Sequence, residues 1–142
     1  MKFSKTIKTA AAAELAIAAG ILLFWISFFT FDLVSIRDPH LKEIYLGFES
    51  AFPFADICLA GVLIAAGVGL LKKASYGVLF SLLGGAALVF LGLLDLSFNA
   101  RHGIYLLGIG EAMINLFINT VCLGAGLFLV RATWKNRFLW KF

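Results

Sequence analysis

The chain alternates between long apolar blocks and short polar segments. Four blocks, residues 10–31, 51–71, 75–96 and 107–130, each approach or exceed the roughly 20 residues that a helix needs to cross a bilayer. Apolar residues run through them almost continuously, whereas a helix on the surface of a soluble protein has a polar face. The pattern predicts an all-α integral membrane protein, with residues 1–142 forming one four-transmembrane-helix bundle.

Composition supports a membrane protein and argues against two other classes. Hydrophobic residues make up 62% of the chain and charged residues 14%, against about 45–50% and about 25% in soluble domains. The first block is longer than the apolar core of a signal peptide, about 7–15 residues, so we expect a retained helix. The net charge of +4 does not indicate nucleic-acid binding, because the basic residues adjoin the spans.

The distribution of basic residues predicts the topology. One side of the predicted bundle holds nine of them: Lys2, Lys5, Lys8, Lys72, Lys73, Arg131, Lys135, Arg137 and Lys141. The other side holds three: Arg37, Lys42 and Arg101. Because cytoplasmic segments are enriched in Lys and Arg, both termini are predicted to be cytoplasmic, in the plasma (inner) membrane. Most acidic residues then lie toward the outer side.

Small residues recur at four-residue spacing on three of the blocks. They are Ala12, Ala16 and Gly20 in the first block, Gly61, Ala65 and Gly69 in the second, and Ser81 and Gly85 in the third. Such faces let helices approach closely in lipid. We expect them to pack within the chain, with a homodimer or a partner subunit as the alternative.

Two segments on the outer side resemble each other. Residues 31–49 carry, in order, Asp32, Leu33, Arg37, His40, Ile44, Tyr45, Leu46 and Glu49. Residues 94–111 carry Asp95, Leu96, Arg101, His102, Ile104, Tyr105, Leu106 and Glu111. The order suggests two parallel-repeat helical hairpins, although two outer loops can also acquire similar residues independently. Asp38-Pro39 in the longer first copy predicts a turn followed by a short interfacial helix.

Carboxylates in or beside the apolar blocks are the main candidates for function. Asp56 lies roughly 8 Å inside the second block if that helix starts near residue 51. Glu49 precedes it by seven residues and shares its face if the helix reaches back that far. Pro53 fits the first helical turn, where its missing N–H is not needed.

Two further blocks bring polar side chains to the same outer half. Glu111, Asn115 and Asn119 form one stripe along the fourth block, because four-residue spacing keeps them on one helix face. Asp95 lies at the end of the third block and Asn99 follows four residues later, just before Arg101 and His102. Since such groups are costly against lipid, they should face one another or a water-filled cavity. For Asn115 and Asn119, simple interhelical hydrogen bonding is the competing interpretation.

Other chemistry has little support in the sequence. No cofactor is predicted, since both His residues lie in outer loops rather than inside the bundle, and no phosphate-binding or hydrolase motif is present. No metal site is predicted either, although His40, His102 and nearby carboxylates leave one conceivable at the outer mouth. Cys58 and Cys122 are expected to be small buried hydrophobes. Glu14 is expected to reach the cytoplasmic interface and pair with Lys8 or Lys72.

The leading functional hypothesis is a small binding or transport protein. Its outer acidic pocket would take a cation, a proton or a small amphiphile, with Glu49 and Asn99 beside Asp56, Asp95, Glu111, Asn115 and Asn119, and with Arg101 and His102 at the mouth. One alternative is an accessory subunit of a larger membrane complex. Another is an enzyme acting on a lipid-like substrate with His102 or a carboxylate as acid or base, although no catalytic motif favours an enzyme.

Overall fold

The computed structural model describes residues 5–31, 33–34 and 36–139, which are almost entirely helical. Asp32, in the first of the two similar segments, lies outside the described residues. The elements in chain order are α1 (Lys5–Thr30), α2 (Pro39–Glu49), α3 (Phe52–Leu71), α4 (Ser75–Arg101), the 3-10 turn η1 (Ile104–Leu106), α5 (Ile109–Asn136) and the 3-10 turn η2 (Arg137–Leu139). Four helical segments are long and apolar enough to cross a membrane: α1, α2 with α3, α4, and α5.

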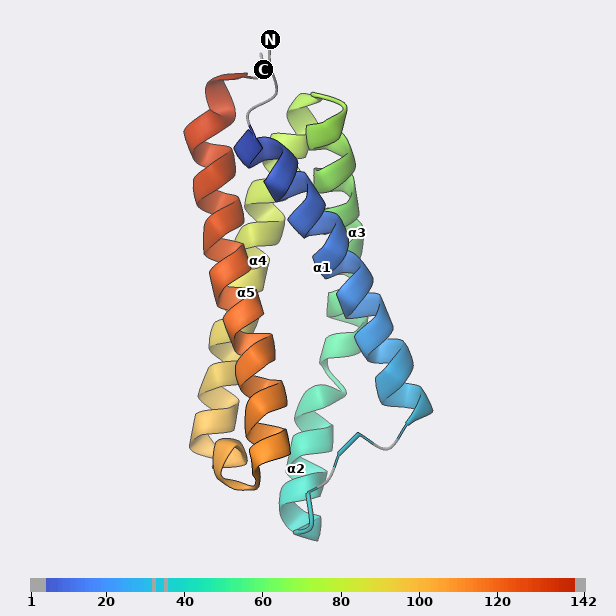
Figure 1. Cartoon of the computed structure of the whole chain (residues 1–142). Helices are drawn as coiled ribbons and strands as arrows, with labels where there is room; N and C mark the ends of the chain where they lie inside the picture. Colours follow the sequence, from blue (N-terminus) through green and yellow to red (C-terminus); the bar gives the residue numbers. More distant parts are fainter. Residues whose placement is uncertain (1–4, 32, 35, 140–142) are drawn as a thin grey trace.

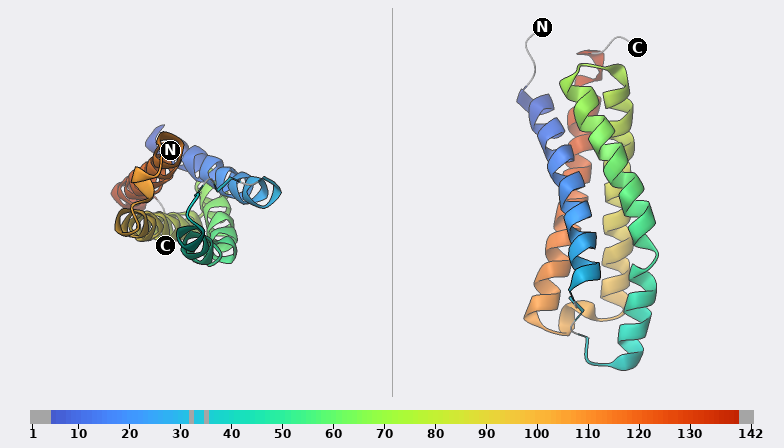
Figure 2. Two further views of the ribbon diagram at one scale, coloured as in Figure 1. Left: turned by 90° about the horizontal axis from the view of Figure 1, so that it is seen from below. Right: turned by 90° about the vertical axis from the view of Figure 1, so that its right-hand side faces the viewer.

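The long helices run up and down side by side (Figure 1 and Figure 2). The main contacts join α1 to α3, α3 to α4, and α4 to α5. Helices α1 and α5 approach each other where the chain starts and ends, and diverge toward the other end of the bundle. The bundle is therefore closed at one end and splayed between α1 and α5 at the other.

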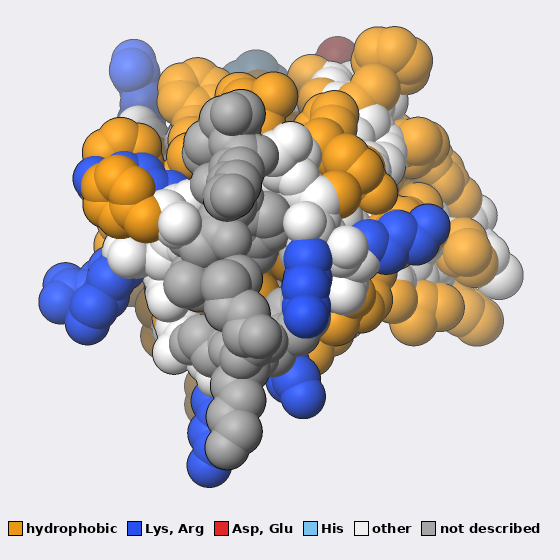
Figure 3. Space-filling view, turned by 90° about the horizontal axis from the view of Figure 1, so that it is seen from above, with side chains coloured by type: hydrophobic (Ala, Val, Ile, Leu, Met, Phe, Trp, Pro, Cys, Tyr) orange, Lys and Arg blue, Asp and Glu red, His pale blue; other side chains and the backbone are white. Residues whose placement is uncertain are grey.

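The two ends differ in charge. The end that carries both termini and the tight turn between α3 and α4 is called the basic end; its described basic residues are Lys5, Lys8, Lys72, Lys73, Arg131, Lys135 and Arg137. Figure 3 views this end and shows Lys and Arg side chains spread around it, with hydrophobic side chains on the flanks. The opposite end, called the acidic end, is formed by the segment before α2, α2 itself, and the turn between α4 and α5.

The second predicted span is preceded by a separate helix. α2 begins as expected after Asp38, whose carboxylate caps it by accepting bonds from His40 N at 2.9 Å and Leu41 N at 3.2 Å. α2 ends at Glu49 and α3 starts at Phe52, with a bend between them (Figure 1). Pro53 explains this bend, because it has no N–H for the Glu49 carbonyl four residues earlier and its ring crowds that carbonyl.

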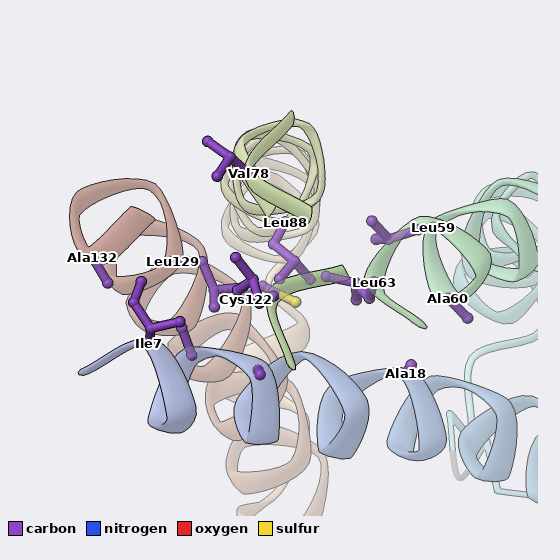
Figure 4. Packing of buried hydrophobic residues seen from close by; sticks show 13 residues of the cluster. Ile7, Ala18, Leu59, Ala60, Leu63, Val78, Leu88, Cys122, Leu129 and Ala132 are labelled. Carbon is purple, nitrogen blue, oxygen red and sulfur yellow. The ribbon is translucent and has the colours of Figure 1, made fainter. Parts of the chain in front are cut away.

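Packing in the interior relies on small residues where helices α4 and α5 meet. A Cβ at Gly126 would lie 2.7 Å from the Gly85 carbonyl oxygen, and a Cβ at Gly85 would lie 3.0 Å from the Gly126 carbonyl oxygen. Side chains of all four long helices fill the remaining space, including Ile7, Leu63 and Leu88 (Figure 4). The prediction that Gly85 packs inside the chain is confirmed, and Gly69 and Ser81 are buried as well. Gly61 on α3 is exposed, so the prediction is wrong for that residue.

Several sequence expectations need correction. The small-residue face of α1 does not pack inside the chain, since Ala12, Ala16 and Gly20 are all exposed. Its buried face carries instead Ile7, Ala10, Ala11, Glu14, Ala18 and Trp25. Helix α1 also starts earlier than residue 10, α4 continues to Arg101, and α5 continues to Asn136. The polar residues at these ends form regular helix and extend the spans beyond their apolar blocks.

The two cysteines behave differently from each other. Cys122 is buried as expected, but Cys58 is exposed on the outside of α3, so the prediction for Cys58 is wrong. Glu14 is also not where the sequence suggested. Its side chain is fully buried inside the bundle instead of reaching the basic end, because α1 starts at Lys5 and tilts its Glu14 face toward the other helices.

Candidate functional site

Asp56 is held by an aromatic partner from another helix. Trp25 Nε1 on α1 donates a hydrogen bond of 2.8 Å to Asp56 Oδ2 on α3. Both residues are buried, at 5% and 8% exposure. The bond partly offsets the cost of placing a carboxylate in an apolar interior. Trp25 fixes one oxygen of the carboxylate and leaves the other for a further partner.

Asn99 is the centre of a polar network between α4 and α5. Its amide Nδ2 donates to Asp95 Oδ2 at 3.0 Å and to Asn115 Oδ1 at 3.2 Å. The Asn115 amide in turn donates to the Glu111 carbonyl oxygen at 2.9 Å. Asn99 and Asn115 are buried, and Asp95 is half-buried. The network brings together three of the predicted polar side chains, Asp95, Asn99 and Asn115, whereas Glu111 contributes only its backbone carbonyl.

Asn119 extends the network deeper along α5. Its Nδ2 donates to the hydroxyl oxygen of Tyr105 at 2.7 Å, and its side chain also interacts with the Asp95 carboxylate. Two amide oxygens, Asn99 Oδ1 and Asn119 Oδ1, are buried without a hydrogen-bond partner among the described residues. Buried acceptors of this kind are normally satisfied. The network therefore has spare acceptors that point to a missing donor.

Glu49 lies within electrostatic range of two carboxylates from two other helices. Glu49, at the end of α2, interacts with the charges of Asp95 and Asp56. Glu49 also interacts with the Tyr45 side chain one turn earlier. The helix does not run unbroken from Glu49 to Asp56, yet the bend keeps both side chains buried and facing the same interior. This group of Glu49, Asp56 and Asp95 is called the carboxylate cluster.

Aromatic rings lie on the helices that carry the carboxylate cluster, and Trp25 and Tyr45 interact with Asp56 and Glu49. The Phe48 and Phe98 rings stack with centroids 3.8 Å apart and an angle of 1° between planes, which ties α2 to α4. Tyr45 lies beside Phe98 with a centroid distance of 6.2 Å. On α1, the Trp25 ring is flanked by Phe24, Phe28 and Phe29. Rings with negative faces next to carboxylates make surroundings that favour positive charge.

The residues predicted at the mouth occupy less central positions. Arg101 is exposed at the last turn of α4. His102 is half-buried, with Nδ1 3.0 Å from the Phe98 carbonyl oxygen and its ring 4.2 Å from the Phe98 ring. These contacts hold His102 against its own helix. Neither residue makes a described contact with the carboxylate cluster, and no specific observation favours a catalytic role for His102.

Glu111 lines a separate hollow at the acidic end. This hollow has a volume of about 680 Å³ and lies between the segment before α2 and the start of α5. Its walls are Leu33, Ile36, Arg37, Asp38, Leu107, Gly108, Gly110, Glu111 and Ile114. Glu111 also lies close enough to Tyr45 for its charge to act on the phenol. The hollow thus adjoins residues that contact the carboxylate cluster and opens where α1 and α5 diverge.

Sequence reasoning missed the partners that organise the cluster. Trp25 and Phe98 were not singled out, and Tyr45 and Tyr105 were noted only within the two similar segments. Comparing positions along the helices would have suggested Trp25 as a partner of Asp56. Trp25 lies five residues before the end of α1, and Asp56 lies four residues after the start of α3. Since neighbouring helices run antiparallel, these positions have similar depth. No comparable pattern in the sequence predicts that Phe48 stacks on Phe98.

Comparison with known proteins does not identify the cluster. Among the residues that the structure describes, no three His, Cys, Asp or Glu side chains are grouped as a metal site. Comparisons with protein-family models, curated protein sequences and solved structures found no match. The function must therefore be inferred from the side chains of the cluster and their surroundings.

Proposed function

We propose that the carboxylate cluster binds a small organic cation, and that the chain is a small membrane binding or transport protein. The observation that carries this proposal is that the charge of Glu49 interacts with those of Asp56 and Asp95. Glu49 and Asp56 are buried, Asp95 is half-buried, and aromatic rings lie on the same helices. Like charges in an apolar interior repel, so a bound positive charge would relieve a large unfavourable energy. Ionisable residues inside a membrane generally mark a ligand or ion pathway.

Aromatic surroundings favour an organic cation over a bare metal ion. Calcium takes six to eight oxygen ligands, whereas Asp56 has an indole N–H beside it and Glu49 has the Tyr45 side chain beside it. Aromatic faces bind alkylammonium groups through cation–π attraction and bury their apolar carbon atoms. The cluster is therefore better suited to an amine with an apolar body.

The spare amide oxygens further define this cation. Asn99 Oδ1 and Asn119 Oδ1 can each accept a hydrogen bond, and both belong to the network that includes Asp95. A protonated primary or secondary amine has N–H groups to donate, whereas a quaternary ammonium has none. We infer that the ligand is a protonated amine and that its N–H groups satisfy these acceptors.

In the proposed orientation the cluster lies in the half of the bundle that faces outward. Nine Lys and Arg residues adjoin the basic end in the sequence, which supports a cytoplasmic position for both termini in the plasma membrane. The acidic end, with the hollow beside Glu111 and the divergence of α1 from α5, would then face outward. We also infer that the α1–α3 and α4–α5 hairpins derive from a duplication. Each hairpin packs tightly, and the two outer segments share their order of residues.

Ligand titration of the reconstituted protein tests the proposal. Phenethylamine is the probe, phenethyl alcohol is the neutral control, and phenyltrimethylammonium is the control without N–H groups. We expect saturable binding of phenethylamine, measured calorimetrically in lipid nanodiscs, at least tenfold weaker binding of both controls, and a loss of at least tenfold in affinity in Asp56→Asn or Asp95→Asn.

Glu43→Gln is the matched control for these variants. Glu43 is an exposed acid on α2, so its loss should leave phenethylamine binding unchanged. Equal effects of Glu43→Gln and Asp56→Asn would mean that surface charge alone attracts the amine. Equal binding of the amine and the alcohol would contradict a cation site.

A second candidate function, an accessory subunit, is favoured by the exposed face of α1. Ala12, Ala16 and Gly20 lie on this face, and a Cβ at Gly20 would meet nothing within 4 Å. Small residues facing lipid can accept another helix at close range. Purification in mild detergent separates the candidates: co-purification of a different membrane protein, lost in Gly20→Leu, would favour the subunit, and a lone monomer or homodimer would count against it.

A further inference from the structure

Glu14 is a buried acid that the proposed amine site does not use. It lies on α1 in the half of the bundle nearer the basic end, and its side chain is 0% exposed. Neither carboxyl oxygen has a hydrogen bond of ordinary geometry with a described residue. An ionised carboxylate without partners in such a place would be very costly. The neutral acid costs far less to bury there, and it can still form a hydrogen bond with a hydroxyl group.

A hydroxyl pair from two other helices faces this acid. Ser81 on α4 lies near the Glu14 carboxyl group, without a hydrogen bond of ordinary geometry between them. The Ser81 and Thr133 hydroxyl oxygens are 2.7 Å apart, both side chains are fully buried, and either can be the donor. Thr133 lies one turn before the end of α5, next to exposed residues of the basic end. The three side chains therefore connect the interior of the bundle to the vicinity of that end.

No buried cation accompanies Glu14 in the described part of the chain. The charged or titratable groups around it in the basic half are Lys8 on α1, Lys72 and Lys73 after α3, Tyr76 on α4, and Arg131 and Lys135 on α5, and all of them are exposed. The other acids, Asp56 and Asp95, belong to the carboxylate cluster in the acidic half. The polar side chains described near Glu14 carry hydroxyl groups. Hydroxyl groups are neutral and can both donate and accept hydrogen bonds.

We propose that Glu14 is a proton-binding site, present as a carboxylic acid whose O–H donates to the Ser81 hydroxyl, which donates to Thr133. When the acid releases its proton to water, the Glu14 O–H bond breaks and a carboxylate remains. The Ser81 hydroxyl then turns to donate to that carboxylate, and the Thr133 hydroxyl turns to donate to Ser81. The hydroxyl pair thus adapts to both states of Glu14 without losing or gaining a proton. This site stands independently of the proposed amine site.

Infrared difference spectroscopy of the full chain in nanodiscs tests the assignment. Spectra are recorded across the pH range in which the protein stays folded, and carboxylic acids are identified by their C=O stretching band. We expect one such band in the wild type to be missing in Glu14→Gln and retained in Glu43→Gln. In Ser81→Ala the same band should shift to higher frequency, because the acid loses its hydrogen-bond acceptor.

Three outcomes would overturn the proposal. One is identical carboxylic-acid bands in the wild type and in folded Glu14→Gln. Another is the absence of any band shift in Ser81→Ala, a variant that keeps Glu14 and remains informative even if Glu14→Gln does not fold. The third is a carboxylate band that is insensitive to pH but changes on adding sodium chloride, which would assign the site to a metal cation. Phenethylamine binding should persist in Glu14→Gln, so failure of one site leaves the other testable.

Discussion

Trp25 on α1 and Asp56 on α3 are joined by a hydrogen bond of 2.8 Å between Nε1 and Oδ2. The bond lies near the end of α1, five residues before Thr30, so it ties this part of α1 to α3. It also holds the Asp56 carboxylate in the cluster with Glu49. One contact therefore supports both the packing of α1 and the geometry of the proposed amine site.

Replacing Trp25 by Phe tests this contact. Trp25→Phe keeps an aromatic ring but removes the donor and leaves a buried carboxylate oxygen unsatisfied. We expect the free energy of unfolding to fall by about 1–3 kcal/mol. Unfolding in detergent, followed by circular dichroism, measures the change. The control is Trp134→Phe, at an exposed position near the basic end.

A double variant distinguishes the hydrogen bond from general packing. In Asp56→Asn the side chain at position 56 is neutral. Adding Trp25→Phe to this variant should therefore lower the free energy of unfolding by less than Trp25→Phe lowers it in the wild type. Additive losses in the double variant would show that Trp25 acts through its ring alone.

The close approach of α4 and α5 predicts the effect of a single methyl group. In Gly126→Ala the new Cβ would lie 2.7 Å from the Gly85 carbonyl oxygen and 2.8 Å from Val89 Cγ2. The helices must separate, and we expect a loss of about 1–3 kcal/mol in the free energy of unfolding. Gly124→Ala is the matched control two residues away, because its Cβ would meet nothing within 4 Å. Equal stability of the two variants would contradict the packing described for α4 and α5.

The cap of α2 predicts a local effect at the acidic end. Asp38→Ala removes the acceptor of the His40 and Leu41 backbone N–H groups. Such a loss costs about 1 kcal/mol, which corresponds to roughly fivefold faster amide exchange in the first turns of α2. Hydrogen exchange followed by mass spectrometry measures it. Glu43→Ala, which leaves the cap intact, should not accelerate exchange in that turn.

Some of the fold follows directly from the sequence, and the Glu49–Pro53 spacing marks a feature that does not. Four apolar blocks predict the number of long helices, and Asp38-Pro39 predicts the start of α2. The sequence places Pro53 in the first turn of the second span. Pro53 also acts on the carbonyl four residues earlier, and this effect ends α2 at Glu49.

The packing face of α1 shows what local patterns do not determine. Ala12, Ala16 and Gly20 have close-packing spacing, but Ala11 and Ala18 on another face are the small residues that are buried. Both faces permit close approach, so spacing alone cannot select between them. The choice depends on partners such as Gly67, where a Cβ would lie 2.9 Å from Leu15 Cγ. The burial of Glu14 follows from the same choice of face, which explains why it was misplaced.

Asn99 provides a test of the network between α4 and α5. Asn99→Ala removes the donor that Asp95 and Asn115 share, leaving two acceptors without it. We expect unfolding to become easier by about 2 kcal/mol, measured by denaturation in detergent. The matched control is Asn136→Ala, whose amide donates only to the Ala132 carbonyl oxygen in the last turn of α5. If Asn99 instead acts mainly as a spacer, Asn99→Leu would restore the wild-type stability, whereas a required donor predicts that Asn99→Leu remains destabilised.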